Sequence, residues 1–337
     1  MPLLVCSRPG GVAWVGDLSQ GATRSLVFGP VRSRRLGVSL GINNIPYKYC
    51  SYSCVYCQLG KTIKLGVERK PFVEPDALVD EVSRALEETG KVDFVTYVPD
   101  GEPTLDYNLG AEIRLLKLEL WVDIAVLTNA SLLWRRDVRL DLSGADLVSL
   151  KVDAASKDVW RKINRPHPSL DFNTVIRGLR EFASEYTGAI ITETMLVRGV
   201  NDDPSELRGI ADIIASISPM KAYIMIPTRP PAEPWVRGAN AEALALLHEE
   251  LRSRGISAEL LTTDEPPPPA SPRDPVKYIL STALVHPLKL DYAKMLVRQA
   301  GLDPDRVIEE LVLRGDVKAV EYRGETFLIR RPPNTHH

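Results

Sequence analysis

Three cysteines in one short segment are the residues of this chain best suited to chemistry. They follow a C-x3-C-x2-C pattern at Cys50, Cys54 and Cys57, and Cys6 is the only other cysteine among 337 residues. Three thiolates on one loop can ligate three irons of an iron–sulfur cube and leave the fourth iron open. The pattern therefore predicts a cluster at which a small molecule can bind and react.

Other interpretations of the three cysteines are weaker. A closed zinc site needs four Cys or His ligands, and the histidine nearest to the segment in the sequence is His167. An odd set of cysteines cannot pair internally as disulfides, and nothing in the sequence suggests secretion. A segment that also carries tyrosine, serine and lysine is a poor core strand. We therefore favour the cluster.

Size and composition predict a soluble protein with one large domain and a smaller appendage. Hydrophobic residues make up 44% and charged residues 26% of the chain, which is ordinary for soluble proteins. No apolar run approaches the roughly 20 residues that span a bilayer. The N-terminus lacks the features of a signal peptide. With few cysteines and an oxygen-sensitive cluster, we expect a cytoplasmic protein without a membrane partner.

Positive charge is concentrated around the cysteine segment. Residues 24–70 contain nine Lys or Arg and one acid, Glu68, although the whole chain has a net charge of −2. This charge could compensate an anionic cluster, or it could steer an anionic substrate such as a nucleic acid to the site. Arg32, Arg34 and Arg35 precede the first expected strand rather than the cluster, which favours a substrate role.

Strand and helix patterns alternate through the middle of the chain. Six segments have the composition of strands: 36–42, 93–98, 122–127, 147–152, 189–196 and 222–226. Helical spacing of apolar residues marks 75–89, 113–118, 174–186, 207–217 and 241–254. The alternation predicts an α/β fold with a curved parallel sheet, a partial (β/α)6 barrel resembling an incomplete TIM barrel. Sites in such sheets lie at the carboxyl ends of strands, and the cysteine segment follows the first strand.

Changes in composition divide the chain into five parts. A run of four prolines makes a stiff linker, and three helices followed by a hairpin predict a small winged-helix-like α+β domain after it. In 273–331 Lys and Arg exceed Asp and Glu by only 11 to 9, which favours binding to protein or packing on its own barrel over nucleic-acid binding. The predicted parts are an N-terminal arm (1–27), the barrel (28–262), the linker (263–274), the winged-helix-like domain (275–331) and a tail (332–337).

The cysteine motif, with Tyr56 directly before Cys57, resembles the signature of the radical S-adenosylmethionine (radical SAM) superfamily. Asp100-Gly101-Glu102-Pro103 resembles the superfamily's Gly-Gly-Glu motif, with Asp100 in place of the first glycine. Together with Gly-Pro-Val-x-Ser-Arg-Arg-Leu-Gly and Gly-Glu-Pro-Thr-Leu, these motifs resemble a group of mostly uncharacterised iron–sulfur oxidoreductases, distantly related to the tRNA wyosine synthases. Wyosine enzymes bind a second cluster on additional N-terminal cysteines, which Cys6 alone cannot supply.

The resemblance covers about residues 28–262 and implies cofactors and a reaction. It implies one [4Fe-4S] cluster, S-adenosylmethionine bound at the open iron, and an external one-electron donor of the ferredoxin or flavodoxin type. Reductive cleavage of S-adenosylmethionine would give a 5′-deoxyadenosyl radical that abstracts hydrogen from a substrate. The residues expected to contact S-adenosylmethionine are Tyr56, Gly101, Glu102, Thr128, Asn129, Asp153 and Glu193.

The substrate is predicted only as a class. Arg165 and His167 lie on a proline-containing loop after the fourth strand, which is either a solvated loop or a grip for an anion. His167 is the candidate proton donor or acceptor there, and Arg165 joins Arg32, Arg34 and Arg35 as candidates for substrate binding. Three functions stay open: an enzyme acting on an anionic substrate such as transfer RNA, a peptide- or protein-modifying enzyme that docks through the winged helix, and a metal-stapled regulator that binds nucleic acid.

Overall fold

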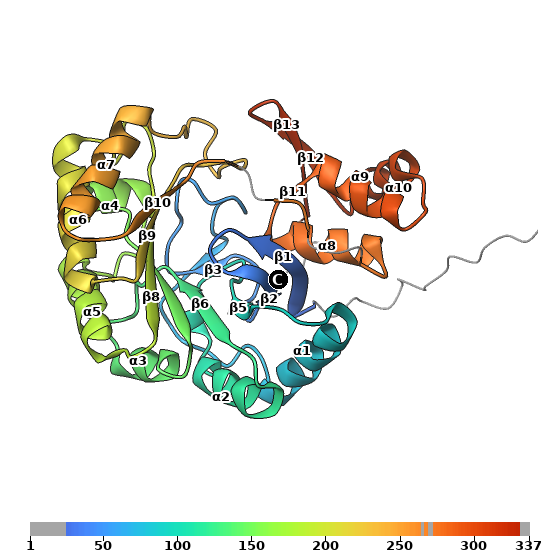
Figure 1. Ribbon diagram of the computed structural model, residues 1–337, viewed down its shortest axis with the longest axis horizontal. Coiled ribbons are helices and arrows are strands. Elements are labelled where there is room, and N and C mark those ends of the chain that lie inside the picture. Colours follow the sequence, from blue (N-terminus) through green and yellow to red (C-terminus); the bar gives the residue numbers. More distant parts are fainter. Residues whose placement is uncertain (1–24, 264–265, 269–271, 331–337) are drawn as a thin grey trace, which may run out of the picture.

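A curved eight-stranded sheet forms the larger part of the computed structural model, which describes residues 25–263, 266–268 and 272–330 (Figure 1). Strand order is β1-β2-β5-β6-β7-β8-β9-β10. From β2 to β10 each strand is parallel to its neighbour, whereas β1 pairs antiparallel with β2. The strands are β1 (Val27–Ser33), β2 (Gly37–Ile42), β5 (Phe94–Tyr97), β6 (Ile124–Thr128), β7 (Leu147–Lys151), β8 (Ala189–Met195), β9 (Lys221–Met225) and β10 (Ala258–Leu261).

The predicted partial barrel is confirmed, and two strands extend the six that the sequence indicated. β10 adds a seventh parallel strand; its four residues are too few to establish a period. β1 adds an antiparallel edge. The Gly-Pro pair within β1 does not end the strand, because the pairing with β2 resumes after a shift of register between Phe28 and Val31. Cys6, most of the predicted N-terminal arm and the tail lie outside the described residues.

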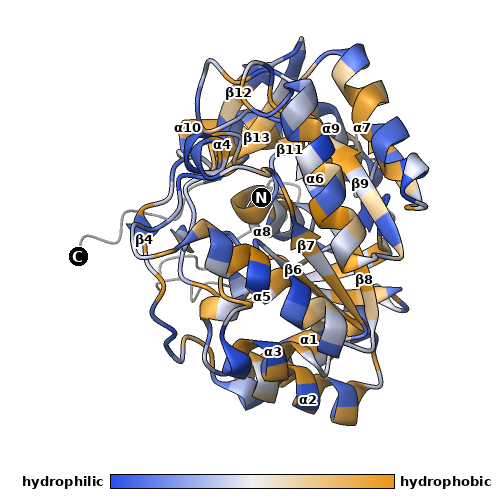
Figure 2. Cartoon of the chain, turned by 90° about the vertical axis from the view of Figure 1, so that its left-hand side faces the viewer, coloured by the Kyte–Doolittle hydropathy of each residue, from blue (hydrophilic) through white to orange (hydrophobic). Residues whose placement is uncertain are grey.

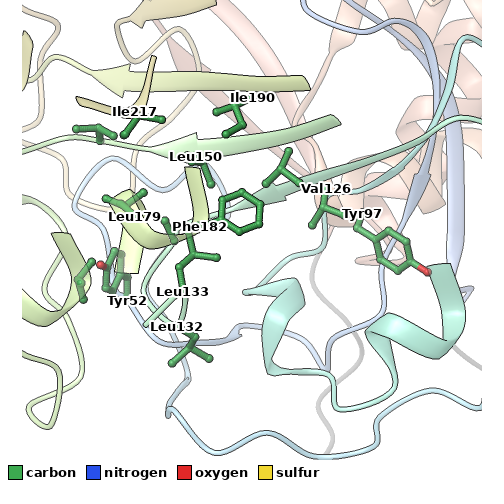
Figure 3. Packing of buried hydrophobic residues seen from close by; sticks show 14 of the residues in the cluster. Tyr52, Tyr97, Val126, Leu132, Leu133, Leu150, Leu179, Phe182, Ile190 and Ile217 are labelled. Atoms are coloured by element: carbon green, nitrogen blue, oxygen red, sulfur yellow. The ribbon is translucent and has the colours of Figure 1, made fainter. Parts of the chain in front are cut away.

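Helices cover the outer face of the sheet (Figure 1). α5 shows why: its N-cap Asp171 accepts a hydrogen bond from the Thr174 backbone N–H, and one face of the helix is apolar. That face packs Leu179 and Phe182 toward Leu150 of β7 (Figure 3). The helices of this part are α1 (Pro75–Thr89), α2 (Leu109–Leu120), α3 (Arg136–Leu142), α4 (Lys157–Ile163), α5 (Phe172–Glu185), α6 (Pro204–Ile217) and α7 (Ala241–Ser253), with a short 3-10 helix, η1 (Pro103–Leu105).

Hydrophobicity follows this layering. Strands β7 and β8 are largely hydrophobic in Figure 2, as expected for parallel strands with both faces buried. α3 and α4 were missed from the sequence because seven residues hold only two helical turns. α2 is longer than predicted at both ends. Within the described residues, every helix falls short of the length and apolar content that crossing a bilayer requires.

The C-terminal part forms a small α+β domain that packs on β1. Its elements are α8 (Pro275–Val285), β11 (Leu288–Lys289), α9 (Leu290–Gln299), α10 (Pro304–Leu313), β12 (Lys318–Tyr322) and β13 (Glu325–Ile329). The three strands form one sheet in the order β11-β13-β12. Leu284 and Val285 pack against Phe28, and the Tyr278 hydroxyl donates to the Pro30 carbonyl at 2.8 Å. The domain therefore lies beside the barrel edge (Figure 1).

A buried carboxyl pair behind the sheet gives a pH-dependent prediction. Burial, together with the neighbouring Asp106, raises the pKa of Glu112 to about 9. Between about pH 5 and pH 9 the folded state therefore keeps a proton that the unfolded chain releases, so stability falls as pH rises, by at most about 1.4 kcal/mol per pH unit. We expect Glu112→Gln to flatten the dependence, measured as denaturation midpoints at pH 6 and pH 8.5.

The matched control for that experiment is Glu119→Gln, which changes an exposed glutamate on the same helix. It should retain the pH dependence of the unmodified protein. An identical pH dependence in Glu112→Gln and Glu119→Gln would contradict the assignment of the proton to the buried pair.

Candidate active site

Backbone pairing fixes the cysteine loop on two sides. β3 (Tyr49–Cys50) pairs with β4 (Lys64–Leu65), so the loop closes on itself. On its other side the backbone N–H groups of Ser53 and Val55 donate at 2.9 Å to carbonyls at Asn164 and Ile163. The segment after α4 therefore runs beside the cysteines, at the carboxyl end of the parallel strands.

Each cysteine sulfur accepts a hydrogen bond from a side-chain nitrogen of a different segment. The bonds are Lys48 Nζ to Cys57 Sγ (3.1 Å), Asn129 Nδ2 to Cys50 Sγ (3.6 Å) and Asn164 Nδ2 to Cys54 Sγ (3.4 Å). Such donors stabilise the thiolate, which is the form that ligates iron. Among the described residues no three Cys, His, Asp or Glu side chains converge on a single-ion position, whereas a cubane takes one thiolate per iron. These residues fit an iron–sulfur cluster held by Cys50, Cys54 and Cys57.

Burial sets the chemistry of the thiols before a cluster binds. Burial, together with the negative charge of Asp153, raises the pKa of Cys54 to about 12. Burial also raises the pKa of Cys50. Both thiols therefore hold their protons at neutral pH in the cluster-free chain, and cluster binding must release them.

Lys48 is a site residue that sequence reasoning missed. Lys48 is 3% exposed. Burial lowers its pKa, but the sulfurs of Cys57, Cys50 and Cys54 together outweigh burial and raise it. Lys48 therefore brings a buried positive charge to the edge of the cluster site. The sequence does place this lysine two residues before Cys50, but the position was considered only as part of the local positive charge.

Glu102, Thr128 and Asn129 come together at the ends of β5 and β6, as predicted for residues of one site. Glu102 is 1% exposed. Its Oε1 accepts from the Thr128 hydroxyl at 2.5 Å and from Thr104, and its Oε2 accepts from the Asn129 backbone N–H at 2.7 Å. The carboxylate thus ties the two strand ends together beside Cys50.

Gly101 shows why the Gly-Glu motif needs its glycine. A Cβ at this position would lie 2.0 Å from the Tyr49 carbonyl oxygen, which is backbone and cannot move without shifting Cys50. We expect Gly101→Ala to destabilise the fold by about 1–3 kcal/mol and to lower the iron bound after anaerobic reconstitution. The control is Gly144→Ala, whose Cβ would meet only the Ile113 side chain at 3.1 Å. If Gly101→Ala binds as much iron as the unmodified protein, the conclusion that this position requires glycine is wrong.

Asp153 and Tyr56 form the opposite wall. The Tyr56 hydroxyl donates to Asp153 Oδ2, which also accepts from Asn164 Nδ2 at 2.8 Å, and Oδ1 accepts from the Met195 backbone N–H at 2.8 Å. Protein donors therefore engage both oxygens of Asp153. In this structure the carboxylate holds the cysteine loop against the ends of β7 and β8.

Glu193 lies in the barrel interior within an ion-pair network. It pairs with Arg35 and with Lys151, and accepts from the Ser149 hydroxyl at 2.8 Å. Burial works to raise the pKa of Glu193, but Arg35 and Lys151 outweigh burial and lower it to about 2. Glu193 therefore stays ionised at every pH at which the protein would be assayed.

The four predicted substrate arginines do not form one group. Arg35 points into the barrel toward Glu193, Arg34 donates to Thr263 at 2.9 Å, and Arg32 lies toward the C-terminal domain. Arg165 pairs with Glu233 at 2.5 Å, and the Glu233 backbone N–H donates to the Val55 carbonyl of the cysteine loop. Only Arg165 is therefore beside the cysteines.

His167, the candidate proton donor or acceptor, lies next to the cysteine loop. Its backbone N–H donates to the Ser51 carbonyl at 2.9 Å. Its Nδ1 is 2.8 Å from the Ser169 hydroxyl, and the side chain is half-buried. The ring contacts found within the described residues are made by Nδ1, so Nε2 is the ring nitrogen that a substrate would reach.

Comparison with known proteins agrees with this site. The family model of the radical SAM superfamily matches residues 44–208. A UPF0026 protein of Methanocaldococcus jannaschii is 37% identical over 312 residues, covering 91% of this chain and 96% of that protein. A probable dual-specificity RNA methyltransferase of Thermotoga maritima is 24% identical over 217 residues, covering 63% of this chain and 61% of that protein.

The solved structure of a radical SAM methyltransferase from Sphaerobacter thermophilus shares the fold, with a TM-score of 0.52, 18% identity and 67% of each chain covered. Members of the superfamily are enzymes that use a [4Fe-4S] cluster and S-adenosylmethionine, so the predicted cofactors are confirmed at the level of the family. This chain belongs to the radical SAM superfamily, within its UPF0026 group.

Proposed function

We propose that this enzyme cleaves S-adenosylmethionine reductively and abstracts a hydrogen atom from an RNA substrate, with transfer RNA as the first candidate. The bound cluster would supply the electron for cleavage, delivered by an external donor of the ferredoxin or flavodoxin type. Cys50, Cys54 and Cys57 would hold the cluster. Their nitrogen donors would keep the sulfurs anionic, and the Glu102 network would hold the cosubstrate side of the site.

The choice of RNA rests on a cluster of positive charge beside the cysteine loop. Lys61 and Arg165 are far apart in sequence, yet both pair with the same Glu233 oxygen, at 3.3 Å and 2.5 Å. Glu233 in turn is bonded to the cysteine loop. Two cations against one carboxylate leave a net positive charge beside the predicted cluster, where a phosphate backbone would be attracted. The likeness to an RNA methyltransferase supports the same substrate class.

The charge of α10 argues against the alternative of a regulator that binds nucleic acid through the winged helix. The exposed positions of this helix carry Asp305, Glu309 and Glu310 against Arg306. A helix with this charge is repelled by phosphates. The hairpin instead contacts the barrel, since the Tyr322 hydroxyl donates to the Pro227 carbonyl at 3.2 Å.

Anaerobic reconstitution followed by incubation with bulk transfer RNA tests the proposal. We expect about four irons per chain, 5′-deoxyadenosine as a product, faster formation of that product when the RNA is present, and transfer RNA binding that weakens steeply with salt. Tight zinc binding without a cluster would overturn the radical chemistry. Cleavage that peptide but not RNA stimulates would favour the protein-modifying alternative.

A further inference from the structure

Lys48 is the charged member of the three nitrogen donors that contact the cysteine sulfurs. Its Nζ donates to Cys57 Sγ at 3.1 Å, whereas neutral asparagine amides donate to the other two sulfurs at 3.6 and 3.4 Å. Within the described residues the ammonium makes no ion pair with a carboxylate. All three cysteine sulfurs lie close enough to Lys48 to raise its pKa. The positive charge of Lys48 is therefore directed at the cysteine loop.

Burial strengthens the effect of this charge on its neighbours. Lys48 is 3% exposed, and charges interact more strongly inside a protein than at its surface because the local dielectric constant is lower. A buried lysine normally has a carboxylate partner, since an unpaired buried charge is unfavourable. Here the partner is a cysteine sulfur, which must be ionised to ligate iron. The counter-charge of Lys48 is therefore complete only when the cysteines are in their ligating form.

The backbone of Lys48 gives a second, independent sign of a role for its side chain. Its φ is 57°, in the left-handed region that glycine adopts easily and lysine rarely. The Lys48 carbonyl accepts hydrogen bonds from the backbone N–H groups of Ile63 and Lys64, at 3.1 and 3.2 Å, which hold this conformation. Glycine would fit the same backbone without strain, and strained residues cluster at functional sites. The lysine side chain is therefore the feature that this position provides.

Reduction of the cluster is the step at which a positive charge beside Cys57 matters. One electron from the external donor enters the cluster, no bond forms or breaks in the protein, and the negative charge of the core with its three thiolates grows by one. A buried ammonium stabilises the more negative, reduced state more than the oxidised state. Net charge and hydrogen bonds to the sulfurs are among the factors that set the reduction potential of iron–sulfur clusters.

We propose that Lys48 is a positioning residue whose ammonium raises the reduction potential of the cluster, so that a donor of the ferredoxin or flavodoxin type can reduce it. This role rests on the radical chemistry of the proposed function and is independent of which substrate follows. The asparagine amides on the other two sulfurs add hydrogen bonds without adding charge, so the charge effect belongs to Lys48.

Redox titration of the reconstituted full chain, followed by electron paramagnetic resonance, tests this role. Lys48→Met keeps the length of the side chain and removes the charge. We expect it to bind about four irons per chain, while its equilibrium constant for reduction falls at least tenfold, a shift of about 59 mV or more to lower potential for one electron. Lys48→Gln keeps an N–H donor without the charge and should shift in the same direction.

The matched control is Lys64→Met, which removes an exposed lysine on the neighbouring strand β4. Water and salt screen an exposed charge, so this variant should keep the potential of the unmodified protein. The choice of reductant gives a second readout. Lys48→Met should cleave S-adenosylmethionine more slowly with a ferredoxin- or flavodoxin-type donor, and titanium(III) citrate, a stronger reductant, should restore much of the rate. A purely structural defect would slow both reactions equally.

The outcomes separate this role from the radical chemistry. An unchanged potential in Lys48→Met with normal iron content would overturn the role of Lys48 and leave the radical chemistry standing. An unchanged potential in Lys48→Gln alone would assign the effect to the hydrogen bond and contradict a role of the charge. Loss of iron in both variants would show that Lys48 serves cluster binding instead. An equal shift in Lys64→Met would also overturn the role of Lys48. An unmodified protein that binds no cluster would overturn the proposed function itself.

Discussion

Cys54→Ala should yield a protein without its cluster and without S-adenosylmethionine cleavage. Cys54 lies between the other two cysteines, and its sulfur accepts a hydrogen bond from Asn164 at 3.4 Å. A cubane held by two thiolates has lost a ligand, and the described residues contain no further cysteine that could replace it. We expect iron content to fall from about four per chain to near zero and cleavage to fall by roughly a thousandfold or more. Iron analysis, visible absorption and 5′-deoxyadenosine yield measure the effect.

The chain contains its own matched control in Cys6→Ala. Cys6 is the one cysteine outside the C-x3-C-x2-C motif, so this variant should reconstitute and cleave as the unmodified protein does. Folding of Cys54→Ala is checked by its melting temperature in the cluster-free state, where both proteins should be similar. Normal iron content in Cys54→Ala, or its loss in Cys6→Ala, would show that the ligand set is wrong.

Glu102→Ala should lower both the free energy of unfolding and the affinity for S-adenosylmethionine. The buried carboxylate accepts from the Thr128 hydroxyl, from the Asn129 backbone N–H and from Thr104. Alanine would leave these donors buried without an acceptor, at a cost of about 3–5 kcal/mol. Asn129 also donates to Cys50 Sγ, so the disturbance would reach the cluster loop. Urea denaturation measures the stability.

Equilibrium dialysis with S-adenosylmethionine distinguishes the two roles of Glu102. If the carboxylate also accepts from the methionine ammonium, binding should fall at least tenfold at temperatures where the variant remains folded. The control is Glu87→Ala, an exposed glutamate on α1, which should change neither quantity. A Glu102→Ala variant that is destabilised but binds the cosubstrate normally would restrict Glu102 to holding the strand ends.

The C-terminal α+β domain contacts the barrel, which limits the use of truncated variants. Its hairpin and α8 both contact the barrel, through Tyr322 and Tyr278. Removing the domain would therefore expose the apolar surface around Phe28. Point variants within the full chain test RNA binding more cleanly than truncation does.

Local patterns were enough to predict the cysteine motif and the parallel sheet. Ligand spacing within a single loop is local, so Cys50, Cys54 and Cys57 could be identified without knowing the fold. The βα alternation is also local and predicted the parallel sheet, which in turn predicted that Glu102, Thr128 and Asn129 would meet at one edge. Short or irregular elements, such as β1, β10 and α3, gave too little periodicity to be recognised.

Which side chains become partners depends on contacts between residues far apart in the sequence. Arg32, Arg34 and Arg35 are almost adjacent in sequence, yet Arg32 on β1 lies toward the C-terminal domain, whereas Arg34 donates to Thr263 and Arg35 pairs with Glu193. Long-range packing likewise brought Asn164 to Cys54 and Arg229 to Gln58. These pairings depend on sheet register and loop path, to which residues distant in sequence contribute jointly. No local pattern encodes them, so sequence reasoning found the reactive loop and could not find its surroundings.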